Sequence, residues 1–336
     1  MRPRVSRKPG SPPNGSPGLT EGPARGSDGQ MTQPNPTFDI IVCGSLHLDI
    51  MVDAPTLPRV DETAVGTAWA YKCGGKGGNQ AVMSAKLGSR TAMIGRIGAD
   101  DFGTRLTAHL DAAKVDRREV GVDPKAGSGM SVAIVKSNGD YGAVIVSGSN
   151  LALDPDETAK AFNRLGGAKI LILQNEIPDP VNVAVARAAR ASGARVILNA
   201  APARPLSADL DVLVDLLVVN RVEAGMLAGL EVNSAEEAAA ALAALGQNRR
   251  DVIVTLGGSG LVVGKMGQKS QFIPATPVSV VSTHGAGDCF IGALARSLAH
   301  QAPLERAAED ASRIAARFVS LSEEQRTGPD ISQFFN

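Results

Sequence analysis

The chain has 336 residues, of which 43% are hydrophobic, so it is long enough to bury one large core. Its 34 basic residues balance 34 acidic ones, and a zero net charge provides no broad cationic surface for nucleic acid. No apolar run approaches the roughly 20 residues that a membrane-spanning helix needs, and the cysteines show no CxxC spacing. We therefore expect reduced thiols, a cytoplasmic location, and neither a membrane nor a nucleic acid as partner.

Residues 1–37 are rich in Pro, Gly, Ser and Arg and contain almost no large apolar side chains. Such a segment buries too little surface to offset the entropy of ordering, so we predict a disordered N-terminal tail. It lacks the apolar core of a signal peptide. Met31 stands just before the first folded segment, which leaves open either a true tail or a misassigned start.

From Phe38 onward, short apolar runs alternate with longer alanine-rich segments of helical spacing. Strands are predicted at Phe38–Gly44, Thr91–Ile97, Lys169–Gln174, Arg195–Asn199, Leu213–Val219 and Asp251–Leu256. Helices are predicted at 77–87, 102–114, 155–165, 180–192, 234–246, 286–299 and 304–320. Strands that are apolar on both faces and separated by helices indicate a mostly parallel sheet between helix layers. Residues 38–336 are therefore predicted to form one α/β domain.

Two stretches do not follow this alternation, Ile50–Cys73 and Met130–Val146. Both have the composition of antiparallel β-structure, and Asn138-Gly139 in the second is a strong signal for a hairpin. We predict that they form a small β-sheet lid, made from about residues 50–73 and 129–147.

The segment from Thr283 to Phe290 reads Thr-His-Gly-Ala-Gly-Asp-Cys-Phe and leads directly into an apolar helix. Its small residues let a ligand approach the backbone, and N–H groups at a helix start near Ala286 would attract an anion. Asp288 is unusual in a simple phosphate site, but its carboxylate could take the proton of an attacking hydroxyl. The local sequence alone fits equally well a first-turn Asp that the helix dipole favours.

This motif and four others, in the same order along the chain, resemble those of the ribokinase/PfkB family of carbohydrate kinases. They are Gly44-Ser45-Leu46-His47-Leu48-Asp49, Gly74-Gly75-Lys76-Gly77-Gly78-Asn79-Gln80-Ala81, Asn220-Arg221-Val222-Glu223, Thr255-Leu256-Gly257-Gly258-Ser259-Gly260 and Gly285-Ala286-Gly287-Asp288. Each is weak alone, whereas five in order over roughly residues 38–320 are specific. The resemblance implies a ribokinase-like fold and an ATP-dependent sugar kinase. In such a kinase Asp288 is the catalytic base, and the anion hole is formed by Gly285, Ala286 and Gly287.

The resemblance places the sugar substrate beside the two N-terminal motifs. It implies sugar contacts from His47, Asp49, Gly75, Lys76, Gly77, Gly78, Asn79, Glu176 and Asp288. Asp49, taken as the end of the first strand, could accept hydrogen bonds from two sugar hydroxyls. Ordinary alternatives are a turn cap for Asp49, a solvated charge for Lys76 and a solvent-facing loop residue for Glu176. A dinucleotide loop at 74–81 is not indicated, because no strand immediately precedes it and the G-x-G-x-x-G spacing is absent.

The same resemblance places the nucleotide in the C-terminal half. ATP would contact Asn220, Thr255, Leu256, Gly257, Gly258, Ser259, Gly260 and Gly287. Asn220 and Glu223 would position Mg²⁺ through water, since Mg²⁺ prefers hard oxygen ligands and retains several waters. The ordinary alternatives are a helix cap for Asn220 and Glu223 and a tight turn for 255–260.

Two departures from the family pattern bear on the ligands. His47 stands where ribokinases usually carry Asn, which leaves the identity of the sugar open. Ser282 replaces an Asp that usually contributes to a monovalent-cation site, and 322–329 lacks the small residues that supply further oxygen ligands. Because a hydroxyl contributes only a dipole where a carboxylate contributes a charge, activation by K⁺ is doubtful.

The family's lids often pair between subunits, so the resemblance also implies a homodimer through the lid. Two other functions remain open. A nucleoside or pseudouridine-type kinase of the same fold would need aromatic or apolar room for a base, and with aromatic residues at 3% we favour ribose or a related free sugar. A non-catalytic sugar- or nucleotide-binding regulator could dispense with the base, so the presence of Asp288, Asn220 and Glu223 argues against it.

Overall fold

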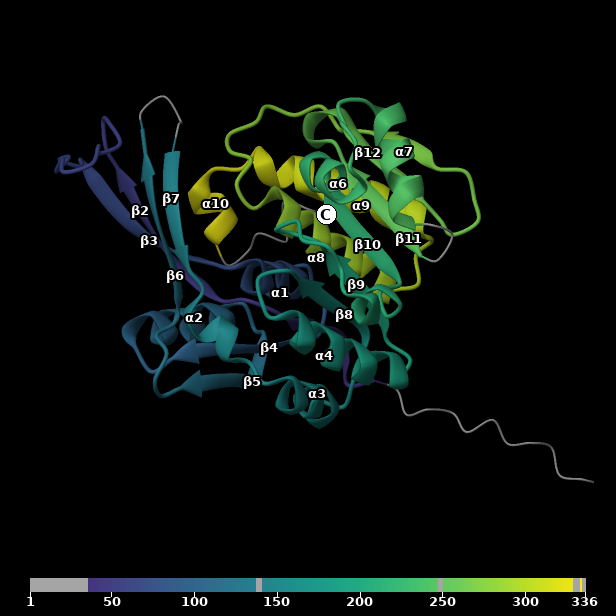
Figure 1. Ribbon diagram of the computed structural model, residues 1–336, viewed down its shortest axis with the longest axis horizontal. Helices are drawn as coiled ribbons and strands as arrows, with labels where there is room; N and C mark the ends of the chain where they lie inside the picture. Colours follow the sequence, from purple (N-terminus) through teal and green to yellow (C-terminus); the bar gives the residue numbers. More distant parts are fainter. Residues whose placement is uncertain (1–35, 137–140, 247–249, 329–332, 334–336) are drawn as a thin grey trace, which may run out of the picture. The chain divides into compact units, whose positions relative to one another are not determined.

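Nine strands form the main sheet in the part of the chain that the computed structural model describes, residues 36–136, 141–246, 250–328 and 333. Their order across the sheet is β13-β12-β11-β10-β9-β8-β1-β4-β5. Their bounds are β1 Phe38–Cys43, β4 Thr91–Gly98, β5 Asp116–Asp123, β8 Ala168–Gln174, β9 Arg195–Asn199, β10 Leu216–Asn220, β11 Asp251–Thr255, β12 Gly260–Gly264 and β13 Gln271–Pro274. Neighbouring strands from β5 to β11 are parallel, and β12 and β13 extend one edge antiparallel (Figure 1).

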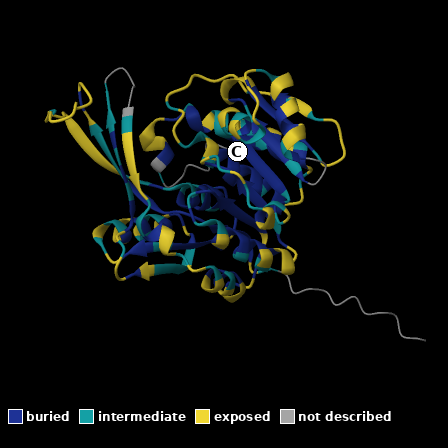
Figure 2. Ribbon diagram, viewed as in Figure 1, coloured by how far each residue is buried: buried dark blue, intermediate teal, exposed yellow. Residues whose placement is uncertain are grey.

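Alternate residues of the buried strands contribute to two cores, one on each face of this sheet. In β1, Ile40 and Val42 belong to one core, and Ile41 and Cys43 belong to the other. The first core is covered by α1 (Lys76–Lys86), α2 (Asp101–Ala112), α8 (Ala286–Ala299) and α9 (Leu304–Val319). The second is covered by α3 (Pro155–Arg164), α4 (Asp179–Ala191), α5 (Ala208–Asp211), α6 (Arg221–Ala228) and α7 (Ala235–Gly246). Figure 2 shows buried strands between helices with exposed outer faces, which confirms the predicted α/β layers.

Every strand and helix predicted for the main sheet is present, with ends that shift by a few residues. The largest difference is at β10, which begins at Leu216 rather than Leu213. The prediction missed β5, whose sequence Asp-Arg-Arg-Glu-Val-Gly-Val-Asp hides a strand among charges, and it also missed the two edge strands β12 and β13. Among the described residues, no helix is both long and apolar enough to cross a membrane.

A second, four-stranded sheet has the order β3-β2-β6-β7. Its strands are β2 His47–Asp53, β3 Ala68–Gly74, β6 Gly129–Val135 and β7 Tyr141–Val146. Both hairpins are antiparallel, as predicted, but β2 and β6 pair in parallel and join them into one sheet. The first strand of this small sheet, β2, starts at His47, earlier than the predicted residue 50. The Asn138-Gly139 turn of the second hairpin lies outside the described residues.

Candidate active site

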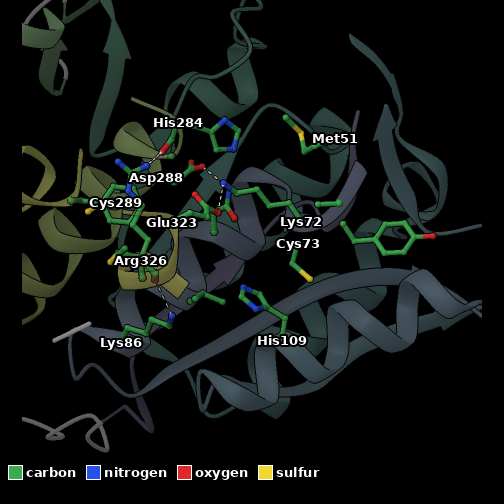
Figure 3. A pocket seen from close by; sticks show the side chains of 17 residues that line it. Met51, Lys72, Cys73, Lys86, His109, His284, Asp288, Cys289, Glu323 and Arg326 are labelled. Atoms are coloured by element: carbon green, nitrogen blue, oxygen red, sulfur yellow. Dashed lines mark hydrogen bonds and ion pairs between the residues drawn. The ribbon is translucent and has the colours of Figure 1, made fainter. Parts of the chain in front are cut away.

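Three adjoining cavities lie at the carboxyl ends of the parallel strands, where open α/β sheets bind their ligands. Their volumes are about 600, 230 and 340 Å³. The first lies between the small sheet and the body of the domain, and Figure 3 shows its lining. Gly285 and Asp288 line both the first and the second cavity, and the second and third share Thr255, Thr283, Ala286, Gly287 and Phe290. The cavities thus form one connected series with the start of α8 at its centre.

The start of α8 is built to expose backbone N–H groups. Gly285 is its N-cap residue, in the left-handed conformation with φ 77°, and no side chain caps the helix. Ala286 donates its N–H to the carbonyl of Thr283 at 3.1 Å. Within the described residues, the N–H groups of Gly287 and Asp288 have no hydrogen-bond partner. A helix N-terminus with open donors attracts anions, and here the donors are at 287 and 288 rather than at Ala286.

Asp288 lies in the first turn of α8, with an edge that faces the cavities and protein around the rest of it. This burial raises the pKa of its carboxyl above the ordinary 3.8. Two amide groups of α1 counteract the shift: Asn79 Nδ2 donates to Oδ2 and Gln80 Nε2 donates to Oδ1, both at 2.9 Å. Lys76 also lowers the pKa through its charge. A carboxylate with a raised pKa and fixed orientation is suited to accept a proton.

Gln80 is a site residue that the sequence analysis missed. It is fully buried, and its own Oε1 accepts a hydrogen bond from Gln174 Nε2 at 2.8 Å. The backbone carbonyl of Gln174 accepts in turn a hydrogen bond from Asn182 Nδ2 at 2.8 Å. The chain of amides holds Asp288 against α1 and β8. The available signal was the position of Gln80 directly before the apolar Ala81-Val82-Met83, since an amide that enters the core needs hydrogen-bond partners.

Removing the Gln80 donor should change the pH dependence of the reaction. Gln80→Met deletes a hydrogen bond to the ionised form of Asp288, so the pKa of Asp288 rises further. The base then stays protonated up to a higher pH, and the acidic limb of the kcat profile should move to higher pH. Gln174→Met leaves the Gln80 amide in place and should give a smaller shift. An unchanged acidic limb in Gln80→Met would contradict this role.

Glu176 follows β8 in the chain and lies beside the start of α1 in space. Its Oε2 accepts the N–H of Lys76 at 2.9 Å and also a hydrogen bond from the Ser45 hydroxyl. Gly75, the N-cap residue of α1, has φ 83° and no side-chain cap, so Glu176 supplies the acceptor that this helix start lacks. The predicted sugar contact of Glu176 stays a prediction, and the observed role is that of a distant helix cap.

The remaining residues of the Gly-rich motif divide between packing and the cavities. Gly77 and Gly78 are buried against Ser45 and Leu46, and a Cβ on Gly77 would lie 2.7 Å from backbone atoms. Asn79 lines the first cavity and Lys76 lines the second. The expectation that no strand precedes this motif is wrong, because β3 runs into it, although β3 belongs to the small sheet rather than to a βαβ unit.

Asp49 does not end the first strand, as the sequence had suggested, but lies within β2 of the small sheet. Its Oδ1 accepts a hydrogen bond from Ser131 Oγ at 2.5 Å. Lys72 is its cross-strand neighbour in the register of β2 and β3. Gly74 leaves room for this carboxylate, since a Cβ there would lie 2.3 Å from Asp49 Oδ2. The hydroxyl of Ser131 on β6 therefore holds the carboxylate, and Gly74 on β3 leaves the space that it occupies.

His47 is buried in the small sheet, and its predicted sugar contact stays a prediction. Only 5% of it is exposed, and its Nε2 is buried without a hydrogen-bond partner among the described residues. A Cβ on Gly129 would lie 2.3 Å from the ring, so the imidazole fills the space that this glycine leaves. Packing within the small sheet explains why the His47 side chain is buried.

Asn220 and Glu223 line the second cavity and form a capping box at the start of α6. Asn220 Oδ1 accepts the N–H of Glu223 at 2.9 Å, and Glu223 Oε2 accepts the N–H of Asn220 at 2.9 Å. Burial raises the pKa of Glu223, and Asp288 adds to this rise. Asn220 and Glu223 thus cap α6, as the ordinary alternative had it. The same hydrogen bonds fix one carboxylate oxygen of Glu223 in the cavity that Lys76 and Asp288 also line.

The third cavity lies behind the loop after β11. Thr255, Gly257, Gly258 and Gly260 line it, as the nucleotide motif suggested, whereas Leu256 is buried in the second core. The opposite walls come from two segments that the sequence analysis did not single out, 275–280 and the C-terminal half of α9. Pro277, Val278, Ala315, Ala316 and Val319 make these walls apolar. The signal in the sequence was the apolar Pro277, Val278 and Val280 outside every predicted helix and strand.

The cysteines next to the motifs are poor nucleophiles. Cys289 is 1% exposed, and burial raises its pKa, to which the charge of Asp288 adds. Burial also raises the pKa of Cys73, which lines the first cavity. Because a thiolate is the reactive form, neither thiol is suited to act as a nucleophile.

Comparisons with known proteins agree with this geometry. The family model of the pfkB family carbohydrate kinases matches residues 37–330. Mouse ribokinase is 33% identical over 314 residues, which cover 91% of this chain and 96% of its own length. A deoxyribokinase of Salmonella typhi is 31% identical over 88% of this chain and 97% of its own length. The structure of Arabidopsis thaliana ribokinase complexed with ribose and ATP superposes with a TM-score of 0.82 at 29% identity, over 90% of this chain and 99% of that one.

Proposed function

The chain belongs to the pfkB family of carbohydrate kinases, and we propose that it transfers the γ-phosphate of ATP to a hydroxyl of ribose or a closely related sugar. Its fold is ribokinase-like and its activity is that of an ATP-dependent sugar kinase. Relatives named ribokinase and deoxyribokinase have similar identity to this chain, so the proposal covers both ribose and 2-deoxyribose.

The observation that carries the proposal is the position of Asp288, which lines both the first and the second cavity. A phosphoryl acceptor in the first cavity and a γ-phosphate in the second would meet at this carboxylate. Asp288 then takes the proton of the attacking hydroxyl, while the N–H groups of Gly287 and Asp288 stabilise charge on the transferring phosphoryl group. Phosphoryl transfer needs chiefly such positioning and charge stabilisation.

The second and third cavities suit the two ends of ATP. Lys76, Asn220 and Thr255 line the second cavity with polar groups for the phosphates. The apolar third cavity, about 340 Å³ in volume, would hold the adenine between the 257–260 loop and α9. Loop 257–260 turns through Gly257 and Gly260, with φ values of 60° and 116°, so its backbone can approach the ribose.

Glu223 is suited to hold Mg²⁺ through water. The described residues contain no cluster of three metal-ligating side chains, so phosphate oxygens and water would make most of its shell. Mg²⁺ would supply positive charge to the triphosphate during transfer. The capping box fixes one oxygen of Glu223 and leaves the carboxylate beside the second cavity.

Glu223→Gln should raise the Mg²⁺ concentration for half-maximal rate by roughly 10-fold, because one negative charge is lost from the outer shell. The Gln side chain can still accept the N–H of Asn220, so α6 should remain capped. The measurement is a Mg²⁺ titration of the initial rate, with Glu231→Gln on the nearby surface as control. Identical titrations for Glu223→Gln and wild type would remove Glu223 from the metal site.

The face of the small sheet that carries Asp49 would close over the sugar. Asp49, Met51, Ala70 and Lys72 share this face, and the last three line the first cavity. Lys72 Nζ pairs with Glu323 Oε1 of α10 (Glu323–Thr327) at 2.8 Å across the cavity (Figure 3). A lid held in this way excludes water, which would otherwise compete with the sugar as phosphoryl acceptor.

A nucleoside is the second candidate acceptor. The first cavity measures about 600 Å³, and Val82, Met83 and Phe318 line it with apolar surface that could accommodate a base. The test is an ATP-consumption screen over ribose, 2-deoxyribose, ketohexoses and nucleosides. Ribose or 2-deoxyribose should give the highest kcat/KM. A preference for nucleosides would replace the free sugar, and no turnover with any acceptor would support the non-catalytic alternative.

The opposite face of the small sheet supports the proposed homodimer. Cross-strand pairing places Ile50, Val52, Trp69, Tyr71, Val132, Val144 and Val146 on this face. Trp69 is 64% exposed and Val144 is 68% exposed. An apolar sheet face that is open to water indicates a partner surface, and pairing of two lids would cover it. Analytical ultracentrifugation of wild type and Trp69→Glu would test the assignment, with a monomeric variant expected.

A further inference from the structure

Arg326 of α10 has a buried guanidinium that binds backbone carbonyls. The residue is 6% exposed, and its Nη2 donates to the carbonyls of Ser282 at 2.6 Å and Val319 at 3.0 Å. Its Nη1 donates to the carbonyl of His284 at 3.4 Å. Three carbonyl oxygens from two separate segments therefore converge on one charged group. Figure 3 shows Arg326 on the wall that also carries Asp288 and Cys289.

Two of the three carbonyls, those of Ser282 and His284, belong to the segment that leads into α8. Ser282 and His284 directly precede Gly285, and the Val319 oxygen also accepts the N–H groups of Val281 at 2.8 Å and Ser282 at 3.2 Å. The segment is thus tied to the end of α9 and to Arg326. Its conformation decides where the first N–H groups of α8 point.

Phe318 joins the guanidinium to the same turn. The guanidinium carbon lies 4.7 Å from the centre of the Phe318 ring, a cation–π contact. On another side, the ring lies 3.5 Å from the position of a Cβ on Gly285. Arg326, Phe318 and Gly285 form a packed series, so displacement of the guanidinium would be felt at the helix start.

The arrangement requires a cation. Carbonyl oxygens that converge on one point repel each other unless positive charge lies among them, and a guanidinium remains protonated even where burial lowers its pKa, as it does for Arg326. Backbone carbonyls are also the ligands that a monovalent metal ion takes. Here the N–H groups of Arg326 occupy them, and the neighbouring Ser282 contributes no charge.

We propose that Arg326 is a positioning residue of the kinase reaction: its guanidinium acts as a built-in monovalent cation that holds 282–285 and orients the phosphate-binding start of α8. This inference rests on the proposed function. It explains why the chain needs no carboxylate at Ser282, and it predicts that K⁺ does not activate the wild-type enzyme.

The test compares wild type, Arg326→Met, Arg326→Lys and the surface control Arg313→Met, whose side chain is 62% exposed and paired with Asp310. Initial rates are measured at constant ionic strength in tetramethylammonium, Na⁺, K⁺, Cs⁺ and guanidinium salts. Arg326→Met should lose roughly 100-fold in kcat, as expected for misplacement of anion-hole donors, with a smaller change in the KM for sugar. Added guanidinium or K⁺ should restore at least about 10-fold, and Arg326→Lys should retain more activity than Arg326→Met.

Hydrogen exchange of the 281–290 amides supplies a readout without any substrate. Exchange should be faster in Arg326→Met and slower again with guanidinium, even if the wild type phosphorylates none of the sugars tested. A failure of the proposed function is thereby distinguished from a failure of this inference. Strong K⁺ activation of the wild type would overturn the inference, as would unchanged kcat in Arg326→Met. A loss that no cation restores, with Arg326→Lys equally inactive, would make Arg326 a structural anchor only and would also overturn it.

Discussion

Asp288→Asn should lower kcat by roughly 1,000-fold, because a positioned general base contributes about 100- to 10,000-fold and the amide cannot accept the proton. Binding of ATP and sugar should persist, since the cavities keep their shape. The Asn side chain would meet two donors, Asn79 Nδ2 and Gln80 Nε2, where the carboxylate offered two acceptors, so a modest loss of stability is expected as well.

The measurements that separate these effects are steady-state kinetics, calorimetric binding of ATP, and the melting temperature. Asp209→Asn is a suitable control because its carboxylate is on the surface, where it pairs with Arg187. If Asp288→Asn turned over at a rate near that of wild type, Asp288 would be only a first-turn residue of α8. If it lost ATP binding in proportion to kcat, its role would lie in the nucleotide site.

Asp49→Ala should raise the KM for the sugar by roughly 100-fold while the KM for ATP changes by less than about threefold. Each charge-assisted hydrogen bond to a sugar hydroxyl contributes about 1.5–3 kcal/mol, and the carboxylate could make two. The position of Asp49 sharpens this prediction, because a residue on the small sheet would act on the sugar without touching the second and third cavities.

Two variants on the same sheet serve as controls for Asp49→Ala. Asp53→Ala removes an exposed carboxylate from the end of the same strand and should leave both KM values unchanged. Ser131→Ala removes the hydroxyl that holds Asp49 Oδ1 and should raise the sugar KM by a smaller factor. If the two KM values rose together in Asp49→Ala, with a lower melting temperature, Asp49 would be a folding residue of the small sheet.

The two predictions rest on different parts of the sequence evidence. For Asp288, the local sequence determined the essentials: small residues allow the left-handed Gly285 and the open helix start, and the carboxylate falls in the first turn. What surrounds Asp288 was not readable locally. Gln80 lies 208 positions earlier, and it reaches Asp288 because α1 and α8 pack on the same face of the sheet.

Asp49 shows where local pattern failed. The stretch Leu46 to Val52 follows the predicted first strand after a few residues, so the sequence suggested that Asp49 ends that strand. In the structure β1 ends at Cys43 in the main sheet, and β2, which contains Asp49, begins at His47 in the small sheet. The partners of β2 are β3 and β6, and register with Lys72 and Ser131 places the carboxylate. Strand pairing of this kind is non-local, and alternation within one strand does not reveal it. His47, expected at the sugar, is buried for the same reason.

The sequence by itself determined the α/β class, most of the helix and strand positions, the family and the residues at the start of α8, because alternation, helical periodicity and glycine sterics act between near neighbours. Only the tertiary structure decided that the cavities meet at the start of α8, that segment 275–280 forms a wall of the third cavity, and that Arg326 binds the carbonyls of Ser282 and His284. These contacts join segments through the crossovers and packing of the whole sheet. A side chain can supply a charge to a loop more than forty residues away only after the fold has brought the two together.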